Sequence, residues 1–181
     1  VDCEYGQTAT YPNNTPSKNP IEGFYYIFEG WTTEVNGEVV DDLSNITGNR
    51  TVYASYKEFV RTLTVYIVSN NSEYGTVTET TLNNIPYGTK IESNGTTVKI
   101  GEYSIDAVEN EANAQYTYSF VEWSHDEKVG NNTIITAIFN CIINKYTITW
   151  MNEDVELSVQ EAVSYGTIPS YNGPEPSKEA T

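Results

Sequence analysis

The only histidine, His125, is the first residue to consider for catalysis, and it lies in the stretch Trp123-Ser124-His125-Asp126-Glu127. A serine hydrolase needs an imidazole that takes the proton of a serine hydroxyl and a carboxylate that orients the ring. Adjacent residues of a strand or turn point to opposite sides, so Ser124 cannot present its hydroxyl to the imidazole of His125. We therefore expect His125 to lie in a solvent-exposed turn without a catalytic role.

Carboxylates are the next candidates, either as acid–base pairs or as metal ligands. With 25 Asp and Glu in the chain, adjacent pairs such as Asp41-Asp42 and Glu153-Asp154 say little about acid–base catalysis and are typical of a solvated surface. The segment 36–49 offers several oxygen ligands for Ca²⁺ but lacks the glycine-punctuated order of an EF-hand. A calcium site and a plain acidic loop both stay open for this segment, whose candidate ligands are Glu38, Asp41, Asp42 and Asn45.

No other motif of known chemistry is present in the sequence. It contains no phosphate-binding Gly-Lys-Ser/Thr loop, no dinucleotide fingerprint and no Cys/His zinc spacing. The two cysteines, Cys3 and Cys141, could form one disulfide or none. The sequence therefore predicts a protein that is not an enzyme, with no catalytic, cofactor-binding or metal-binding residues.

Tyrosines in two aromatic stretches suggest an alternative function, because flat aromatic faces stack on sugar rings. In an alternating strand half of these side chains face inward, and the core then takes Phe28 and Phe120 and the tyrosines on the same faces. This leaves Tyr25 as the exposed ring of the first stretch. A carbohydrate-binding module is the alternative that this composition supports, with Tyr25, Tyr26, Tyr116 and Tyr118 as the residues in question.

The strands that must position these residues recur along the chain. Residues 25–31 (YYIFEGW) and 116–123 (YTYSFVEW) both carry aromatic residues on alternating positions and a Trp three places after a Phe. This pattern predicts a half-buried strand that closes with a large apolar side chain. We expect Trp31 and Trp123 to occupy equivalent positions in the core or at its edge.

Further signals recur in the same order along the chain. A Tyr-Gly pair stands at residues 5–6, 87–88 and 165–166, a closing strand at 51–56 and 134–139, and an opening strand at 63–67 and 146–150. They define three repeat units: residues 1–58, which lack the opening strand; residues 59–141, a complete unit with a hairpin inserted around Asn94-Gly95; and residues 142–181, the N-terminal half of a further unit.

One short helix is expected in the complete unit, over residues 106–115, because Asp106 can cap its start and several helix-permissive residues follow. Prolines at 16 and 20 exclude a regular helix at the same place in the first unit. Residues 176–181 read as the first turn of such a helix in the last unit. The sequence thus predicts an α+β, β-rich fold with one short helix per complete unit.

This order of motifs, from the Tyr-Gly-Thr turn to Tyr-x-Tyr-x-Phe-x-x-Trp and Thr-x-x-Ala-x-Phe/Tyr, resembles the Listeria-Bacteroides repeat family, also met as the internalin B-repeat. The resemblance covers nearly the whole chain. It implies tandem small β-grasp-like modules with a mixed sheet crossed by one helix. It also implies a secreted or cell-wall-attached bacterial protein in which the repeats act as a stalk or adhesin segment without catalytic residues.

Composition and charge limit the classes of molecule that can be partners of this chain. The net charge of −16 repels phosphate backbones and anionic lipid heads, so nucleic acid is a poor partner. No apolar run approaches the roughly 20 residues of a membrane helix, so we expect no membrane insertion. The chain starts at Val1 and not at Met, and we expect it to be processed or part of a longer protein. An extracellular, cell-surface or cell-wall location is expected, with a host or cell-surface protein or a glycan as partner.

The two incomplete units predict self-association. Residues 1–58 lack a strand of the type that residues 142–181 have to spare, and unpaired strand edges are pairing sites. We expect the region 145–170 either to complete residues 1–58 of a neighbouring chain, head to tail, or to stay poorly ordered. The joins at 57–60 and 140–143 are short, which predicts an extended arrangement of the units.

Overall fold

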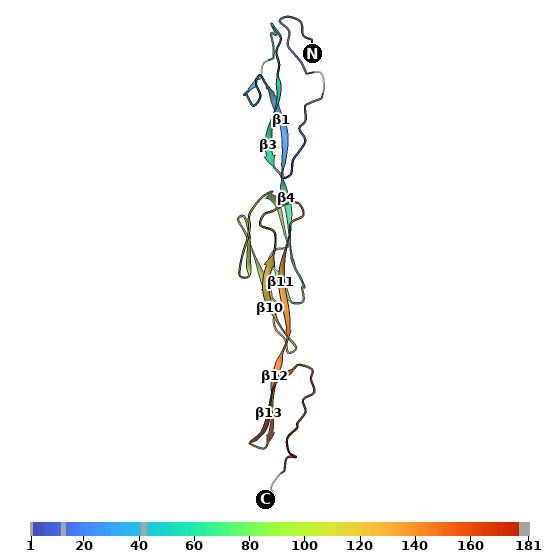
Figure 1. Ribbon diagram of the computed structural model, residues 1–181, viewed down its shortest axis with the longest axis vertical. Coiled ribbons are helices and arrows are strands. Elements are labelled where there is room, and N and C mark those ends of the chain that lie inside the picture. Colours follow the sequence, from blue (N-terminus) through green and yellow to red (C-terminus); the bar gives the residue numbers. More distant parts are fainter. Residues whose placement is uncertain (1, 12–13, 41–42, 178–181) are drawn as a thin grey trace. The chain divides into compact units, whose positions relative to one another are not determined.

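The computed structural model describes residues 2–11, 14–40 and 43–177, and this part of the chain is all-β, with strands and connecting segments but no helix (Figure 1). The chain divides into two compact units. One consists of Val1–Thr64, Asn83–Thr89 and Lys128–Asn132, and the other of Val65–Leu82, Lys90–Glu127 and Thr133–Thr181.

The described residues form thirteen strands. In chain order they are β1 (Phe24–Thr32), β2 (Val39–Val40), β3 (Tyr53–Val60), β4 (Thr62–Ser69), β5 (Gly75–Val77), β6 (Thr81–Pro86), β7 (Ile91–Asn94), β8 (Thr97–Ile100), β9 (Tyr103–Glu109), β10 (Tyr116–Ser124), β11 (Ile134–Ile143), β12 (Lys145–Asn152) and β13 (Val155–Ser164).

These strands make four sheets. Their orders are β2-β1-β3, β10-β11-β4-β6, β5-β9-β8-β7 and β12-β13. The second sheet is mixed, because β11 runs antiparallel to β10 but parallel to β4, with Ile134–Ala137 opposite Tyr66–Ser69. The expected hairpin around Asn94-Gly95 is present as β7 and β8, with Asn94 paired to Thr97 and with Gly95 and Thr96 as the connecting residues.

The core lies almost wholly between the two four-stranded sheets. On β4, Val65 and Ile67 are fully buried while Tyr66 and Val68 are exposed, which is the alternation of a strand with one face in the core. Apolar residues from the other sheet, among them Val98, Ile100 and Ile105, complete it. The two sheets approach so closely that a Cβ on Gly75 of β5 would lie 2.3 Å from the ring of Phe139 on β11, which leaves room for glycine only.

The prediction of an α+β fold was wrong, because strand β9 occupies the start of the expected helix at 106–115. Ile105 and Ala107 are buried on one face of β9, while the Asp106 side chain accepts a 2.6 Å hydrogen bond from the Thr97 hydroxyl on β8. The two-residue period of the apolar positions thus prevails over the helix-permissive residues that follow. Residues 110–115 and 176–177 are not helical either, and residues 178–181 lie outside the described part.

The two aromatic strands have the same register and the same irregularity. In β1 the pairing with β3 shifts between Phe28 and Gly30, and in β10 the pairing with β11 shifts between Phe120 and Glu122. A bulge changes the phase of a strand, so a Phe and a Trp three residues apart come to share one face. Their ring centroids lie 5.5 Å apart in the first strand and 5.8 Å apart in the second.

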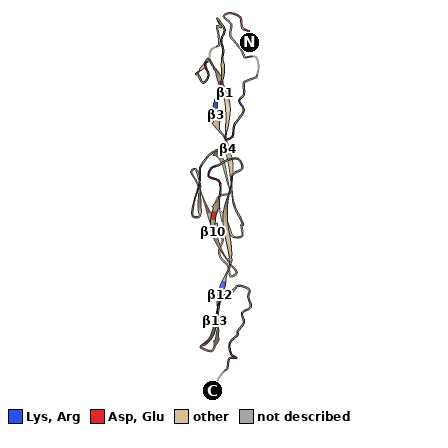
Figure 2. Cartoon of the chain, in the orientation of Figure 1, with Lys and Arg blue, Asp and Glu red and all other residues tan. Residues whose placement is uncertain are grey.

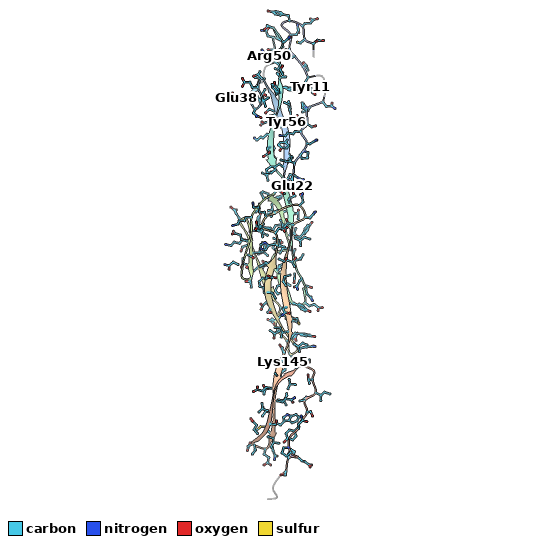
Figure 3. All side chains as sticks on the ribbon, viewed as in Figure 1. Tyr11, Glu22, Glu38, Arg50, Tyr56 and Lys145 are labelled. Carbon is cyan, nitrogen blue, oxygen red and sulfur yellow. The ribbon has the colours of Figure 1, made fainter. Side chains whose placement is uncertain are left out.

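The Trp of each strand stands opposite an Ala of the partner strand, as Trp31 with Ala54 and Trp123 with Ala137. The predicted equivalence of Trp31 and Trp123 is therefore confirmed in register. Their burial differs, because Trp123 is 7% exposed whereas Trp31 is half-buried and packs against Tyr11, with ring centroids 5.0 Å apart. Tyr11 is labelled in Figure 3.

Three of the four Tyr-Gly pairs, at 5–6, 87–88 and 165–166, form the same turn, whereas Tyr74-Gly75 leads directly into β5. The amide of the residue after the glycine donates to the carbonyl of the residue before the tyrosine, at 3.0, 3.1 and 3.0 Å in the three copies. Gly6, Gly88 and Gly166 all have φ near +80°, which the third residue of a type II turn requires and which glycine adopts without a steric cost.

Trp123→Ala tests the assignment of the core. Removing a buried indole should cost about 3–5 kcal/mol of unfolding free energy, measured by urea denaturation with far-UV circular dichroism. Trp31→Ala should cost less, because its side chain is half-buried. The exposed neighbour Val121 provides the control, since Val121→Ala should change stability by less than about 0.5 kcal/mol. A Trp123→Ala loss as small as that of the control would place the indole outside the core.

Candidate functional site

His125 lies in the connection between β10 and β11, and the described residues place no Ser-His-carboxylate arrangement around it. Its Nδ1 is 2.7 Å from the backbone oxygen of Asp126 and its Nε2 is 3.2 Å from the hydroxyl of Ser93. Ser124 does not contact the ring through a hydrogen bond, and among the described residues no carboxylate hydrogen-bonds it either. The half-buried ring therefore links the β10–β11 connection to Ser93 of β7. No described carboxylate orients the imidazole as a general base toward the Ser93 hydroxyl.

No metal centre is formed by the described residues, which contain no group of three or more His, Cys, Asp or Glu side chains placed to hold an ion. Asp41 and Asp42 lie outside the described residues, so the calcium site at 36–49 stays a prediction. Both cysteines are free thiols in the structure, and Cys3 is 3.6 Å from the carbonyl of Glu4.

The aromatic side chains of β1 are shared between two faces, as the alternation predicts, and Tyr25 is exposed as expected, at 41%. Its ring stacks on Phe59 of β3, with centroids 5.3 Å apart and the planes 17° from parallel. Tyr26 is on the opposite face, under the ammonium of Lys18 at 3.8 Å. One face of the Tyr25 ring is therefore already covered, and a sugar could stack on the other face only.

A cavity of about 510 Å³ lies in the first compact unit. We call it the β3 cavity, because Val52, directly before β3, lines it. Its other lining residues come from the N-terminal segment and from the segment before β3: Asp2, Cys3, Tyr5, Ala9, Leu43, Ile46, Thr47, Gly48, Asn49 and Arg50 (Arg50 is labelled in Figure 3). Its lining mixes apolar side chains, such as Leu43, Ile46 and Val52, with polar ones, such as Asp2, Asn49 and Arg50.

A second recurring feature is the junction that follows each closing strand. The single residue between β3 and β4, Arg61, donates its amide to the Gly23 carbonyl at 2.8 Å and accepts the Tyr87 amide at 2.8 Å. The single residue between β11 and β12, Asn144, does the same with Gln115 and Tyr165 at 2.9 Å each. Both junctions are therefore fixed by the same two backbone hydrogen bonds.

Side chains reinforce the first junction through close packing. Gly23 has φ +79°, and a Cβ there would lie 2.2 Å from the ring of Tyr87, so only glycine fits. The Tyr87 ring also lies 6.4 Å from that of Phe24. Loss of hydration and a hydrogen bond to the Glu22 carboxylate raise the pKa of Tyr87 above its ordinary value (Glu22 is labelled in Figure 3).

Amide side chains reinforce the second junction instead. The Asn144 carbonyl oxygen Oδ1 accepts a 2.6 Å hydrogen bond from the Thr117 hydroxyl, and its Nδ2 donates to the Asn113 backbone at 2.7 Å. Asn113 in turn accepts from the amides of Gln115 and Tyr116, at 2.8 Å each. The two junctions share a backbone pattern while their side chains differ, so a comparison of the side chains alone would not have found them.

No protein-family model, curated protein or solved structure matches this chain. Within the described residues there is also no helix with the length and apolarity that a membrane crossing requires.

Glu22→Gln tests the first junction through the ionisation of Tyr87. The carboxylate favours the protonated phenol, so its neutralisation should lower the pKa of Tyr87 toward the ordinary value, while the part due to lost hydration remains. Because the folded protein holds this proton more tightly than the unfolded chain, the stabilisation is complete below the ordinary tyrosine pKa and is lost as the pH rises through the raised one.

The measurement is a ¹³C NMR titration of the labelled tyrosine rings. Glu58→Gln serves as the matched control, because burial and a hydrogen bond to Glu58 raise the pKa of Tyr26 in the same way. Each substitution should move its own tyrosine only. An unchanged Tyr87 titration in Glu22→Gln would mean that the Glu22 contact does not persist in solution.

Proposed function

We propose that this chain is a non-catalytic, load-bearing segment of a secreted or cell-surface protein, where it acts as a stalk or adhesive spacer. The observation that carries the proposal is the parallel pairing of β4 with β11 in the complete repeat unit. The chain enters this unit through β4 and leaves it through β11, so these two strands receive any tension applied along the chain.

Parallel pairing of the entering and leaving strands determines how the unit resists that tension. A pull toward the N-terminus acts on the start of β4, and a pull toward the C-terminus acts on the end of β11, so the two strands are sheared past each other. The amides of Tyr66 and Asn70 donate to the carbonyls of Thr133 and Ala137 at 3.3 and 3.0 Å, which bracket the paired segment. In shear these bonds are loaded together and not one after another, which makes rupture slow.

The junctions support the same proposal. A single residue separates β3 from β4 and β11 from β12, and both of its backbone groups are hydrogen-bonded. Tension is therefore passed from strand to strand with little slack. The extended arrangement of the repeat units stays a prediction.

Surface chemistry supports a stalk that stays dissolved and avoids polyanions. Strands β1, β10 and β12 carry one charged residue each (Figure 2), β9 and β13 carry two acidic residues each, and the chain as a whole has a charge of −16, which repels polyanions. A secreted or wall-attached bacterial setting, with a host protein or a glycan as partner, rests on the resemblance to the Listeria-Bacteroides repeats.

Single-molecule force spectroscopy, with the chain held at its two ends, tests the load-bearing role. We expect one high-force rupture from the complete unit, with a gain of roughly 250–300 Å in contour length for about 80 released residues. The terminal hairpins should extend at low force. Forced unfolding reports the unfolding rate, so the rupture force depends on the clamp between β4 and β11.

Val68→Pro is the decisive variant and Val68→Ala its control. The Val68 amide lies between those of Tyr66 and Asn70 and faces β11 in the parallel ladder, and proline removes this donor whereas alanine keeps it. Val68→Pro should lower the rupture force well below that of Val68→Ala. Equal forces in the two variants, or a complete unit that extends at the same low force as the hairpins, would contradict the proposal.

A further inference from the structure

The outer edge of β3 has no strand partner among the described residues. In its sheet β3 is the last strand and pairs with β1 alone. Its counterpart in the complete unit, β11, has β10 on one side and β4 on the other. The pairs β1–β3 and β10–β11 share register and bulge, so the bare edge of β3 is the edge that β4 covers on β11.

Burial at corresponding positions shows what this edge leaves open. Ile135 and Ala137 of β11 are fully buried, whereas their counterparts 83 residues earlier, Val52 and Ala54, are half-buried. Val129 is 1% exposed, whereas its counterpart Ile46 is half-buried and lines the β3 cavity together with Val52. The β3 cavity therefore lies where the complete unit holds a strand of the β4 type.

The backbone groups of the outer β3 edge also match a strand of the β4 type. On β11 the carbonyls of Thr133 and Ala137 accept amides of β4, so alternate residues of this edge face β4. Ile135 lies on the same edge between Thr133 and Ala137, and Val52 and Ala54 are the counterparts of Ile135 and Ala137 in the first unit. No backbone hydrogen bond joins Val52 to another described residue, and Val52 lines the β3 cavity.

The chain also contains the complementary strand. β12 and β13 correspond to β4 and β6, since each pair is followed by the same Tyr-Gly turn, and a residue with positive φ stands three places before the Tyr in both, Asn84 and Ala162. Ile148 and Trp150 hold the positions of Val65 and Ile67, which are fully buried on β4. Both are half-buried on β12, where the Trp150 ring packs against that of Tyr171 with centroids 5.4 Å apart. The only strand partner of β12 among the described residues is β13.

We propose that β12 of one copy of this chain docks parallel to the outer edge of β3 of a second copy. Thr149–Asn152 then lie opposite Thr51–Ala54, which is the register of Tyr66–Ser69 against Ile134–Ala137 in the complete unit. Trp150 fills the β3 cavity beside Val52, and the Val52 amide and carbonyl gain strand partners. The recognition is β-strand addition with an apolar anchor.

Docking also makes two Tyr-Gly turns, at residues 5–6 and 165–166, compete for the backbone of Ile46. Gly6 and Gln7 exchange backbone hydrogen bonds with Ile46 at 2.9 and 3.0 Å, as Gly88 and Thr89 do with Val129 at 2.8 Å each. The incoming β13 ends in the same turn, at Tyr165-Gly166, and brings it to Ile46. One turn replaces the other with equivalent bonds, so the exchange has little net cost in hydrogen bonding. The favourable free energy of docking comes from the pairing and burial of β12.

The two surfaces are different and lie at opposite ends of the sequence, so the association is heterologous. Each docked copy offers a further β12 and a further β3 edge, and the assembly grows instead of closing as a two-fold dimer. This proposal is independent of the stalk function.

Sedimentation velocity over a concentration series tests it with two surface variants. Val52→Asp places a charge in the β3 cavity, and Trp150→Asp removes the anchor from β12. We expect the wild-type sedimentation coefficient to rise with concentration, while each variant alone stays monomeric. Mixing the two variants should give a complex of twice the monomer mass that grows no further, since only one intact pair of surfaces remains.

The mixture also controls for folding, because a variant that had lost its fold could not supply the surface that it keeps intact. Met151→Pro provides a second β12 variant that leaves Trp150 in place, since the Met151 amide corresponds to that of Val68 and faces the docking edge. It should behave like Trp150→Asp, both alone and in the mixture with Val52→Asp. A wild-type chain that stays monomeric up to its solubility limit, or a mixture of folded variants without a 1:1 complex, would overturn the proposal.

Discussion

The parallel contact between β4 and β11 is the interaction on which the rest of the structure depends. It joins strands whose paired residues are 68 positions apart, so the chain loses considerable entropy before the contact forms. In return Val65, Ile67, Ile135 and Ala137 leave water completely. Where this contact exists the chain has a core, and in the β2-β1-β3 sheet and the β12–β13 hairpin, which lack it, few side chains are buried. A two-stranded hairpin alone is marginally stable in water, so the same repeat sequence has different stability in different copies.

Half of this fold could be predicted from the sequence. The alternation around Trp31 and Trp123, the Tyr-Gly pairs and the Asn94-Gly95 turn are local signals, and the strands and turns stand where these signals put them. The bulge could not be predicted from them, although the Phe-x-x-Trp spacing is its consequence, because a spacing of three places two residues on opposite faces of a regular strand. The helix prediction was wrong at Asp106 because helix-permissive residues are weak evidence against the burial of Ile105 and Ala107, which only the second sheet makes possible.

The candidate sites show the same division between local and long-range information. That His125 and Ser124 could not form a catalytic pair followed from their adjacency, whereas the contact of His125 with Ser93 joins residues 32 apart and leaves no pattern in the sequence. The junctions at Arg61 and Asn144 could not be predicted from the sequence for another reason. Their recurring bonds are made by backbone groups, which every residue type supplies, so Arg and Asn serve the same purpose with different side chains.

Native-state hydrogen exchange would show most directly whether the β4–β11 contact separates the stable copy of the repeat from the others. At a concentration where the chain is monomeric, the amides of Val68 and Ile135 should exchange only when the complete unit opens as a whole. The amides of Val52 and Met151, which face the corresponding edges without a β4–β11 contact, should exchange orders of magnitude faster. If Val52 and Ile135 were protected to the same degree, stability would be uniform along the chain and would not depend on the pairing of β4 with β11.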